Sequence, residues 1–392
     1  MTLVQPINEP PASIRGGGPT ALSRVLLDLG DATAGPTLLC IAGLHGNEPA
    51  GVHALRRLAG PLTAIESELA GRVVGLAGNL QALAAGRRYF EQDLNRVWPR
   101  GPETRHRGDG SIELGELGEL GRAIDRVRAA ATGPIYCLDL HTTSGPGPAF
   151  AVLNDTLPNR AFALTFPVPV VLGLEEELAG TLAGYLSDLG MQVVGFESGQ
   201  HEDPESIDRA EDAIWIALGA AGVLDRGRDE IRSARRALAR ASARLPKLVE
   251  VRYRHALSIS DSFRIHRGLQ GFQPVPAGSE LGRDADGPVR APADGLLLMP
   301  LYQELGDEGF FITRRVRPVW LRLSTFLRRL QLERVLHWLP GVARHPEMAS
   351  TFVVDRHRAR WLALELFHLL GFRRLEMDAD SLTMTRRLWD DS

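Results

Sequence analysis

Residues 36–58 read PTLLCIAGLHGNEPAGVHALRRL. The run Pro36–Leu44 is apolar throughout, which predicts a strand covered on both of its faces. Glu48–Leu58 carries a proline in its first turn and an apolar stripe at helical spacing, so it predicts a helix directly after a tight loop. Strand, tight loop and helix in this order are typical of the start of a parallel α/β unit.

The same alternation continues through residues 20–222 and predicts a mixed, mostly parallel sheet with helices on both faces. One helix is expected over Glu175–Leu189, closed by Gly190. Three repeats of an acid-leucine-glycine triplet predict another helix, whose apolar stripe we expect at Leu114, Leu117, Leu120, Ile124 and Val127. Further strands are predicted over Arg24–Leu29, Arg72–Ala77, Ile135–Leu140, Phe150–Leu153, Val168–Leu172 and Met191–Phe196.

Residue composition and pattern divide the chain into four predicted parts. Residues 1–225 form the predicted α/β domain, and 226–246 a charged linking helix. Residues 247–318 are rich in glycine, proline and short alternating segments, as in a small β domain. Residues 319–392 are predicted as an α+β extension with a helix near Leu323–Leu330, a second over Trp361–Leu370, and a hairpin between Leu375 and Met384.

Composition excludes several classes of function. The 392 residues carry a net charge of −3, so nothing favours nucleic acid or an anionic membrane as a partner. A reaction that forms a Schiff base needs a lysine. Lys247 is the sole lysine, and no motif around it supports such a reaction. Cys40 and Cys137 lie in apolar runs, as small core residues do, and no signal pattern precedes residue 20. A cytoplasmic location is the prediction.

Chemistry is concentrated where predicted strands end. His45 and Glu48 follow one strand, His141 a second and Glu197 a third. In open α/β sheets, ligands bind at the carboxyl ends of the strands. Two histidines and one carboxylate leave a zinc ion with an open position, as in hydrolytic rather than structural sites. Glu197 would then be the carboxylate that moves the proton. Taken alone, His45 and Glu48 would equally fit a solvated pair on a loop.

Four short motifs resemble the succinylglutamate desuccinylase and aspartoacylase family of the zinc carboxypeptidase clan, in the order expected of it. They are His45-Gly46-Asn47-Glu48, Asp93-Leu94-Asn95-Arg96, Asp139-Leu140-His141-Thr142 and Gly195-Phe196-Glu197-Ser198-Gly199. The motifs cover roughly residues 20–225, and the following β region also resembles the second domain of that family. The resemblance implies a zinc carboxypeptidase-like fold.

The resemblance also implies roles for residues at matching positions. His45, Glu48 and His141 would hold one Zn²⁺ per chain, and Glu197 would act as general base and acid toward a zinc-bound water. Arg88 would polarise the scissile carbonyl. Asn95 and Arg96 would bind the carboxylate of the substrate. Asp139 is expected either to orient a ligating histidine or to serve a purely structural role.

The function expected from this set is hydrolysis of an amide bond in a small N-acyl amino acid or a related amide. A carboxypeptidase-like peptidase and a non-enzymatic scaffold that binds partners through its C-terminal extension are the alternatives, and self-association is left open. One departure bears on the substrate. No arginine occurs between Arg160 and Arg209, where the family uses one, so a carboxylate on the acyl group has no assured partner.

Overall fold

The computed structural model describes residues 22–99, 110–258, 262–330, 336, 338–346, 348, 351–355, 357–359, 367–377 and 381–386. The region searched for an N-terminal signal lies outside the described residues. So does most of the helix predicted over Trp361–Leu370. No described helix is both long and apolar enough to cross a membrane, and the cytoplasmic location stays a prediction.

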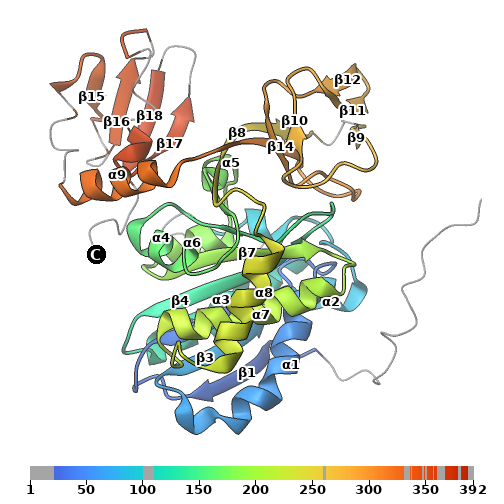
Figure 1. Ribbon diagram of the computed structural model, residues 1–392, viewed down its shortest axis with the longest axis vertical. Helices are drawn as coiled ribbons and strands as arrows, with labels where there is room; N and C mark the ends of the chain where they lie inside the picture. The colour runs from blue at the N-terminus through green and yellow to red at the C-terminus, as the bar shows by residue number, and fades with distance from the viewer. Residues whose placement is uncertain are drawn as a thin grey trace, which may run out of the picture.

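One sheet of 11 strands forms the framework of the molecule (Figure 1). Its central strands β3, β2, β4 and β7 are all parallel, and so are the pairs β5–β6 and β6–β8. The mixed, mostly parallel core that the sequence predicts is therefore confirmed. In sheet order the strands are β1 Val25–Gly30, β3 Arg72–Ala77, β2 Thr37–Ala42, β4 Ile135–Thr143, β7 Gln192–Gln200, β5 Phe150–Val152, β6 Val170–Leu172, β8 Leu248–Ala256, β14 Glu308–Arg315, β13 Gly295–Leu298 and β10 Pro274–Val275.

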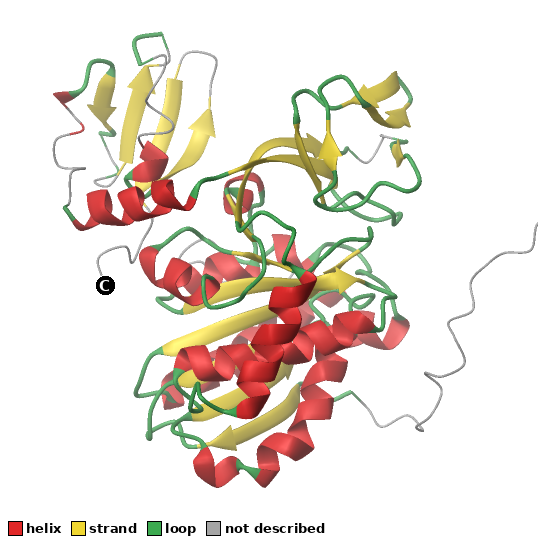
Figure 2. Ribbon diagram, viewed as in Figure 1, coloured by secondary structure: helices red, strands yellow, loops and turns green. Residues whose placement is uncertain are grey.

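Helices cover both faces of the parallel part (Figure 2). Alternate residues of β2 pack into two different hydrophobic clusters, with Leu38 and Cys40 in one and Leu39 and Ile41 in the other. The first cluster includes side chains of α1, α7 and α8, and the second those of α3 and α6. The helices are α1 Ala50–Ala64, α2 Leu80–Ala85, α3 Ile112–Ala130, α4 Leu157–Ala163, α5 Leu174–Glu177, α6 Leu182–Asp188, α7 Glu205–Ala221, α8 Asp229–Ala241 and α9 Pro318–Arg329, with short 3-10 turns η2 Glu66–Glu68 and η3 Leu94–Arg96.

The single helix predicted over Glu175–Leu189 is wrong. Two short helices, α5 and α6, stand there, and Gly180 lies in the extended link between them. Gly180 has φ +67°, and a Cβ at this position would lie 2.1 Å from the carbonyl oxygen of Arg96. The chain therefore breaks its helix here in order to run close against the Asn95–Arg96 segment.

The apolar stripe predicted for α3 is correct only in its second half. Leu120, Ile124 and Val127 are buried, but near the start of the helix Glu113 and Glu116 are the buried residues. The Glu113 carboxylate accepts hydrogen bonds from the backbone N–H groups of Phe90 and Glu91. Glu116 does the same for the first turn of α2. Carboxylates are buried because backbone donors need acceptors there.

Two smaller sheets follow the main one. The β region adds β12 Gly287–Arg290, β11 Glu280–Asp284 and β9 Arg264–Ile265, which form a three-stranded sheet. The tail has helix α9 and a four-stranded antiparallel sheet of β15 Val342–Arg344, β16 Thr351–Asp355, β18 Ser381–Arg386 and β17 Phe372–Met377. The predicted C-terminal hairpin is confirmed as the pair β17–β18. The four domain boundaries stay predictions.

Candidate active site

Three neighbouring strands of the sheet carry the predicted chemical groups. His45 and Glu48 lie in the loop after β2, His141 near the end of β4, and Glu197 within the last part of β7. Because β2, β4 and β7 are adjacent and parallel, these ends meet at one edge of the sheet. His141 and Glu197 are direct partners in the β4–β7 pairing. The fold thus brings together residues that are up to 152 positions apart, from His45 to Glu197.

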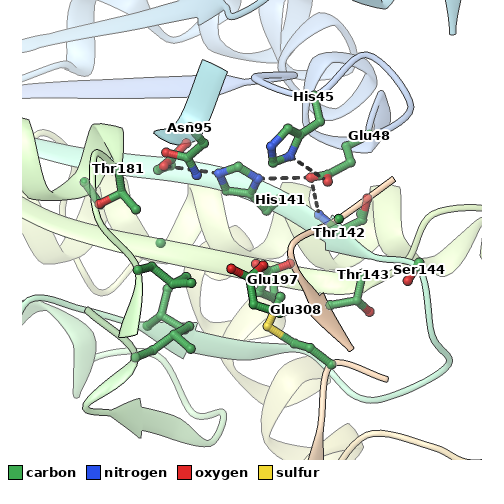
Figure 3. A pocket seen from close by; sticks show the side chains of 18 of the residues that line it. His45, Glu48, Asn95, His141, Thr142, Thr143, Ser144, Thr181, Glu197 and Glu308 are labelled. Atoms are coloured by element: carbon green, nitrogen blue, oxygen red, sulfur yellow. Dashed lines mark hydrogen bonds and ion pairs between the residues drawn. The ribbon is translucent and has the colours of Figure 1, made fainter. Parts of the chain in front are cut away.

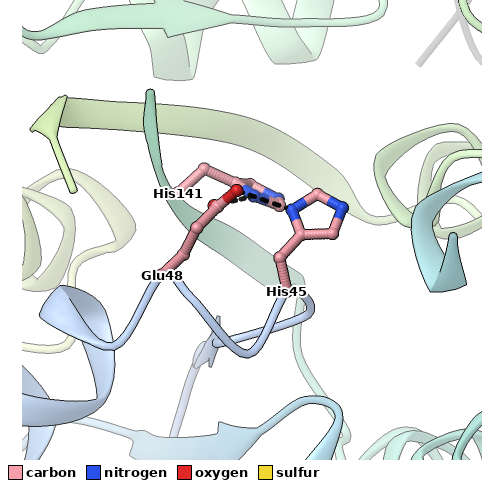
Figure 4. A group of neighbouring side chains, drawn as sticks. All are labelled: His45, Glu48 and His141. Atoms are coloured by element: carbon pink, nitrogen blue, oxygen red, sulfur yellow. Dashed lines mark hydrogen bonds and ion pairs between the residues drawn. The ribbon is translucent and has the colours of Figure 1, made fainter. Parts of the chain in front are cut away.

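His45, Glu48 and His141 form a compact buried group (Figure 4). One potential ligand atom from each lies within 4.8 Å of the other two. Nδ1 of His45 is 2.8 Å from Glu48 Oε1, and Nδ1 of His141 is 3.0 Å from Glu48 Oε2. The backbone N–H of Thr142 also donates to Glu48 Oε2, at 3.1 Å. The carboxylate therefore stands between the two imidazoles.

The far side of each imidazole faces a second carboxylate. Nε2 of His45 lies 2.9 Å from Asp93 Oδ1, and Nε2 of His141 lies 3.2 Å from Asp139 Oδ2. A carboxylate that accepts the Nε2 proton fixes the tautomer that leaves the Nδ1 lone pair open. This arrangement is common for histidines that bind metals. Asp93 belongs to a motif that the sequence singles out, yet no role was predicted for it.

The electrostatics of the group favour a cation at its centre. Burial alone would raise the pKa of Glu48, but the charges and hydrogen bonds of His45 and His141 outweigh burial and hold that pKa well below its usual range. Burial would lower the pKa of His141, but Asp139 and Glu48 raise it well above the ordinary value. Positive charge beside these carboxylates is strongly stabilised. A metal ion would supply that charge between the same atoms.

The residues present fit a zinc ion. Two imidazole nitrogens and a carboxylate oxygen are ligands that Zn²⁺ accepts, and three protein ligands leave a position open for chemistry. Four polar atoms of the predicted site residues are buried without a hydrogen-bond partner: Arg88 Nε, Asp139 Oδ1, Glu197 Oε2 and His141 Nε2, whose approach to Asp139 Oδ2 at 3.2 Å is an ion pair rather than a well-formed hydrogen bond. Unsatisfied buried polar atoms in a native site point to a ligand or a reaction.

The acidity of Glu197 is shifted toward neutral pH. Burial, together with the charges of Glu48 and Asp139, raises its pKa to about 8 against the opposing charges of His141 and Arg88. A buried carboxyl group with a raised pKa is suited to accept a proton and return it near neutral pH. The charge of a bound cation would favour the ionised form of this group.

Arg88 is buried against the same group of acids. Its guanidinium donates to Glu48 Oε1 at 3.2 Å and to Asp93 Oδ2 at 2.9 Å. The neighbouring Arg87 instead stands over the ring of Phe90, with its guanidinium carbon 5.2 Å from the ring centre. The two adjacent arginines thus have different surroundings, and Arg88, the one predicted for the site, is the one that contacts the acids. Glu113 holds the backbone just after Arg88, as described above.

Asn95 and Arg96 lie at the junction with the broken helix. Asn95 Oδ1 accepts the backbone N–H of Leu182 at 2.8 Å, which leaves its amide NH₂ group to donate elsewhere. Arg96 donates to Glu308 Oε2 at 3.0 Å, and Arg254 donates to Glu308 Oε1 at 2.9 Å. Two guanidinium groups share one carboxylate, so the trio keeps a net positive charge. Neither Glu308 nor Arg254 carries a signal in the sequence.

All eight predicted site residues line or adjoin one cavity of about 130 Å³ (Figure 3). His45, Glu48, Arg88, Asn95, Arg96, Asp139, His141 and Glu197 are all among its lining residues. His201, four residues after Glu197, also lines it and holds Thr142 Oγ1 at 2.7 Å and Gln303 Oε1 at 3.1 Å. Burial lowers the pKa of His201, so its ring is neutral at pH 7. The roles of these residues stay predictions.

Residues 34–219 match the family described as "Succinylglutamate desuccinylase/Aspartoacylase catalytic domain". Residues 34–219 of the chain belong to this family. The predicted family is therefore confirmed. Its four motifs all lie within the matched residues.

Curated relatives are matched over part of their length. A succinylglutamate desuccinylase of Pseudomonas paraeruginosa is 37% identical over 114 residues, which is 29% of this chain and 33% of the relative. One of Pseudomonas fluorescens is 36% identical over 89 residues, which is 23% of this chain and 26% of the relative. The matches thus span about a third or less of the length of these desuccinylases.

Solved structures in the family share the fold over a longer stretch. A succinylglutamate desuccinylase/aspartoacylase from Rhodobacter sphaeroides has a TM-score of 0.56 at 21% identity, with 74% of this chain and 88% of the other covered. The ectoine utilization protein EutE (DoeB) from Ruegeria pomeroyi, solved with product bound, has a TM-score of 0.53 at 24% identity, with 72% and 87% covered. These likenesses confirm the fold class.

Proposed function

We propose that the protein is a zinc-dependent amidohydrolase that removes the acyl group from an N-acyl amino acid or a related small amide. One observation carries the proposal: a His-Glu-His group and an acid with raised pKa meet in a single cavity at the carboxyl edge of the sheet. The family assignment supports the same reaction class.

His45, Glu48 and His141 would hold the ion. Zinc, when bound, supplies a Lewis acid that polarises a carbonyl and lowers the pKa of water. Asp93 and Asp139 orient the two imidazoles through their Nε2 atoms.

The other polar side chains transfer the proton, stabilise the developing charge and bind the substrate carboxylate. Glu197 takes the proton of the attacking water and delivers it to the leaving amine nitrogen. Arg88 places a positive charge beside the carbonyl oxygen as negative charge develops on it. Asn95 and Arg96 bind the carboxylate of the amino acid. Asn95 does so through its NH₂ group, and Arg96 belongs to the group of Arg96, Arg254 and Glu308, which carries a net positive charge.

The lining of the cavity supports a small substrate over a long peptide. Met299, Leu301, Gln303 and Glu308, from the β13–β14 segment, line the same cavity as His45 and His141. A segment of the β region thus stands across the site from the metal group. The carboxypeptidase-like alternative has no comparable support.

Metal analysis together with a substrate panel tests the proposal. We expect about one zinc per chain after purification and loss of hydrolysis on chelation, restored by added Zn²⁺. The substrates are N-acyl amino acids, with short peptides of matching C-terminal residue as controls. A folded protein that binds no divalent metal, or one that cleaves the peptides and spares the N-acyl amino acids, would contradict it.

A further inference from the structure

The cavity has one apolar wall. Its members are Val152, Leu174, Leu178, Met299 and Phe311. All five belong to, or pack against, a single hydrophobic cluster that is distinct from the two clusters flanking the central strands. They therefore form a continuous surface rather than scattered apolar contacts. The wall is built by β5, α5 with the residue that ends it, and the β13–β14 region.

The arginines that line the cavity are each held by carboxylates. Among the described residues that line the cavity, the arginines are Arg88 and Arg96, and no lysine lines it. Arg88 is held by Glu48 and Asp93, and Arg96 by Glu308. Two acids of the cavity lining, Glu175 and Glu308, lie on the segments that build the apolar wall. The nearby cation Arg254, which pairs with Phe311 across β8 and β14, is held by Glu308. A second carboxylate on the substrate would therefore meet hydrocarbon and negative charge on this side.

The backbone at the wall is held in an uncommon conformation. Met299 has φ +49° and Phe272, just behind the wall, has φ +64°. They are the non-glycine residues with positive φ in the described part of the chain. This conformation costs a bulky residue roughly 1–2 kcal/mol, and such residues tend to occur at functional sites. At Met299 it carries a large, adaptable side chain into the lining of the cavity.

We propose that the apolar wall binds the acyl group, and that the enzyme selects uncharged hydrocarbon acyl groups against carboxyl-bearing ones such as succinyl. This inference rests on the proposed function. Burial of each methylene against the wall stabilises the bound state, whereas an acyl carboxylate there would lose its water without gaining a cation. Asn95 and Arg96 are left to bind the carboxylate of the amino acid part.

Butanoyl and succinyl derivatives provide the matched comparison, because both acyl groups have four carbons and differ by one carboxylate. With zinc-loaded protein and one amino acid at a time, we expect kcat/KM to rise by about fourfold per methylene from acetyl to hexanoyl. We expect the succinyl compound to fall at least about 100-fold below the butanoyl compound. Equal or faster hydrolysis of the succinyl compound would overturn the inference.

Variants of Met299 locate the effect in the wall. Met299→Gly suits the positive φ and removes the side chain, so it should lower kcat/KM for the hexanoyl substrate at least about tenfold and that for acetyl less than threefold. Met299→Leu should keep the preference because it conserves volume. Leu164→Ala, at an exposed residue outside the cavity, should change neither substrate. An unchanged hexanoyl to acetyl ratio in Met299→Gly would contradict the assignment of the wall.

Binding separates this inference from the proposed function. Butanoate and succinate are titrated into zinc-loaded protein by calorimetry, which requires no turnover. If no amide in the panel is hydrolysed, the proposed function fails. Tighter binding of butanoate than succinate would then still support selection by the wall. Tighter binding of succinate would overturn it whether or not the protein is an enzyme.

Discussion

The two sides of the cavity are built in opposite ways. The polar side comes from short motifs at the ends of β2, β4 and β7 and in the loop around η3, and the imidazoles of His45 and His141 each lie within 3.2 Å of two carboxylates. The apolar side is the surface of a hydrophobic cluster assembled from segments that lie up to 161 positions apart, from Phe150 to Phe311. Reaction chemistry is thus tied to a few local patterns, while substrate choice depends on packing between distant segments. Mutations should separate the two.

Glu197→Gln should produce the largest effect, on the polar side alone. It removes the group that moves the proton while preserving shape, so kcat should fall by roughly 10²- to 10⁴-fold. Zinc content and the ratio of hexanoyl to acetyl substrate affinity should not change. Glu202→Gln, at an exposed acid five residues away, is the matched control. Loss of zinc from Glu197→Gln would mean that Glu197 is a ligand.

Arg328→Ala should destabilise the packing that supports the apolar wall of the cavity. Arg328 of α9 is buried and donates to the side chain and backbone carbonyl of Asp155, which follows the Val152–Asn154 part of the cavity lining. Removing Arg328 should lower the free energy of unfolding by about 3 kcal/mol. This is the lower end of the cost of breaking a buried ion pair, because Arg160 still pairs with Asp155. Denaturant unfolding measures this.

The exposed neighbour Arg329 provides the control, since Arg329→Ala should change stability by less than about 0.5 kcal/mol. Arg328→Ala should also weaken the preference for long acyl groups while leaving zinc content unchanged. Equal stability of the two variants would show that the extension does not support the wall.

Asp139→Asn should have a smaller effect, a loss of zinc affinity on the polar side. The amide keeps the shape of the side chain but cannot stabilise His141 as a carboxylate does, so zinc affinity should fall roughly 10- to 100-fold. Competition with a chromophoric chelator measures it. Asp125→Asn on the exposed face of α3 should have no effect. Wild-type zinc affinity in Asp139→Asn would favour the purely structural role that the sequence left open.

Gly180→Ala should have the smallest effect of these variants, a rise in KM caused by movement of the neighbouring Arg96 segment. The positive φ alone costs roughly 1–2 kcal/mol for alanine, and the new Cβ must push the Arg96 carbonyl away. We expect KM for the amino acid part to rise more than kcat falls, because Arg96 moves and Glu197 does not. Gly118→Ala on α3, where no backbone lies near the Cβ, is the control and should stabilise slightly. A change in kcat without a change in KM would contradict this.

Four residues of the polar side could be predicted from the sequence because each lies at the end of an apolar strand, whereas Arg88, Asn95 and Arg96 lie elsewhere and were predicted from the family resemblance. His45, Glu48, His141 and Glu197 each follow or end such a run, and parallel strands that are neighbours bring their ends together. Contacts between distant segments gave no such pattern. Arg96 and Glu308 are 212 positions apart, and neither residue type predicts the other.

The missed features have physical reasons of their own. Gly180 falls inside the single helix predicted over Glu175–Leu189, because its need for close approach to Arg96 depends on the tertiary fold. No buried role was predicted for Glu113 and Glu116, because a buried carboxylate is costly unless donors meet it. Those donors are backbone N–H groups in other loops. The apolar wall has no motif, since its residues are ordinary core residues that happen to border a cavity.

The continuous hydrogen bonding of the main sheet has a mechanical consequence. β6 pairs with β8 and β8 with β14, so the sheet that carries the group of His45, Glu48 and His141 also carries the strand bearing Phe311 and Glu308. The two sides of the cavity cannot swing apart as separate bodies without breaking ladder hydrogen bonds. Substrate must enter by movement of loops and side chains, and the parts of the molecule on both sides of the cavity should melt in one cooperative step.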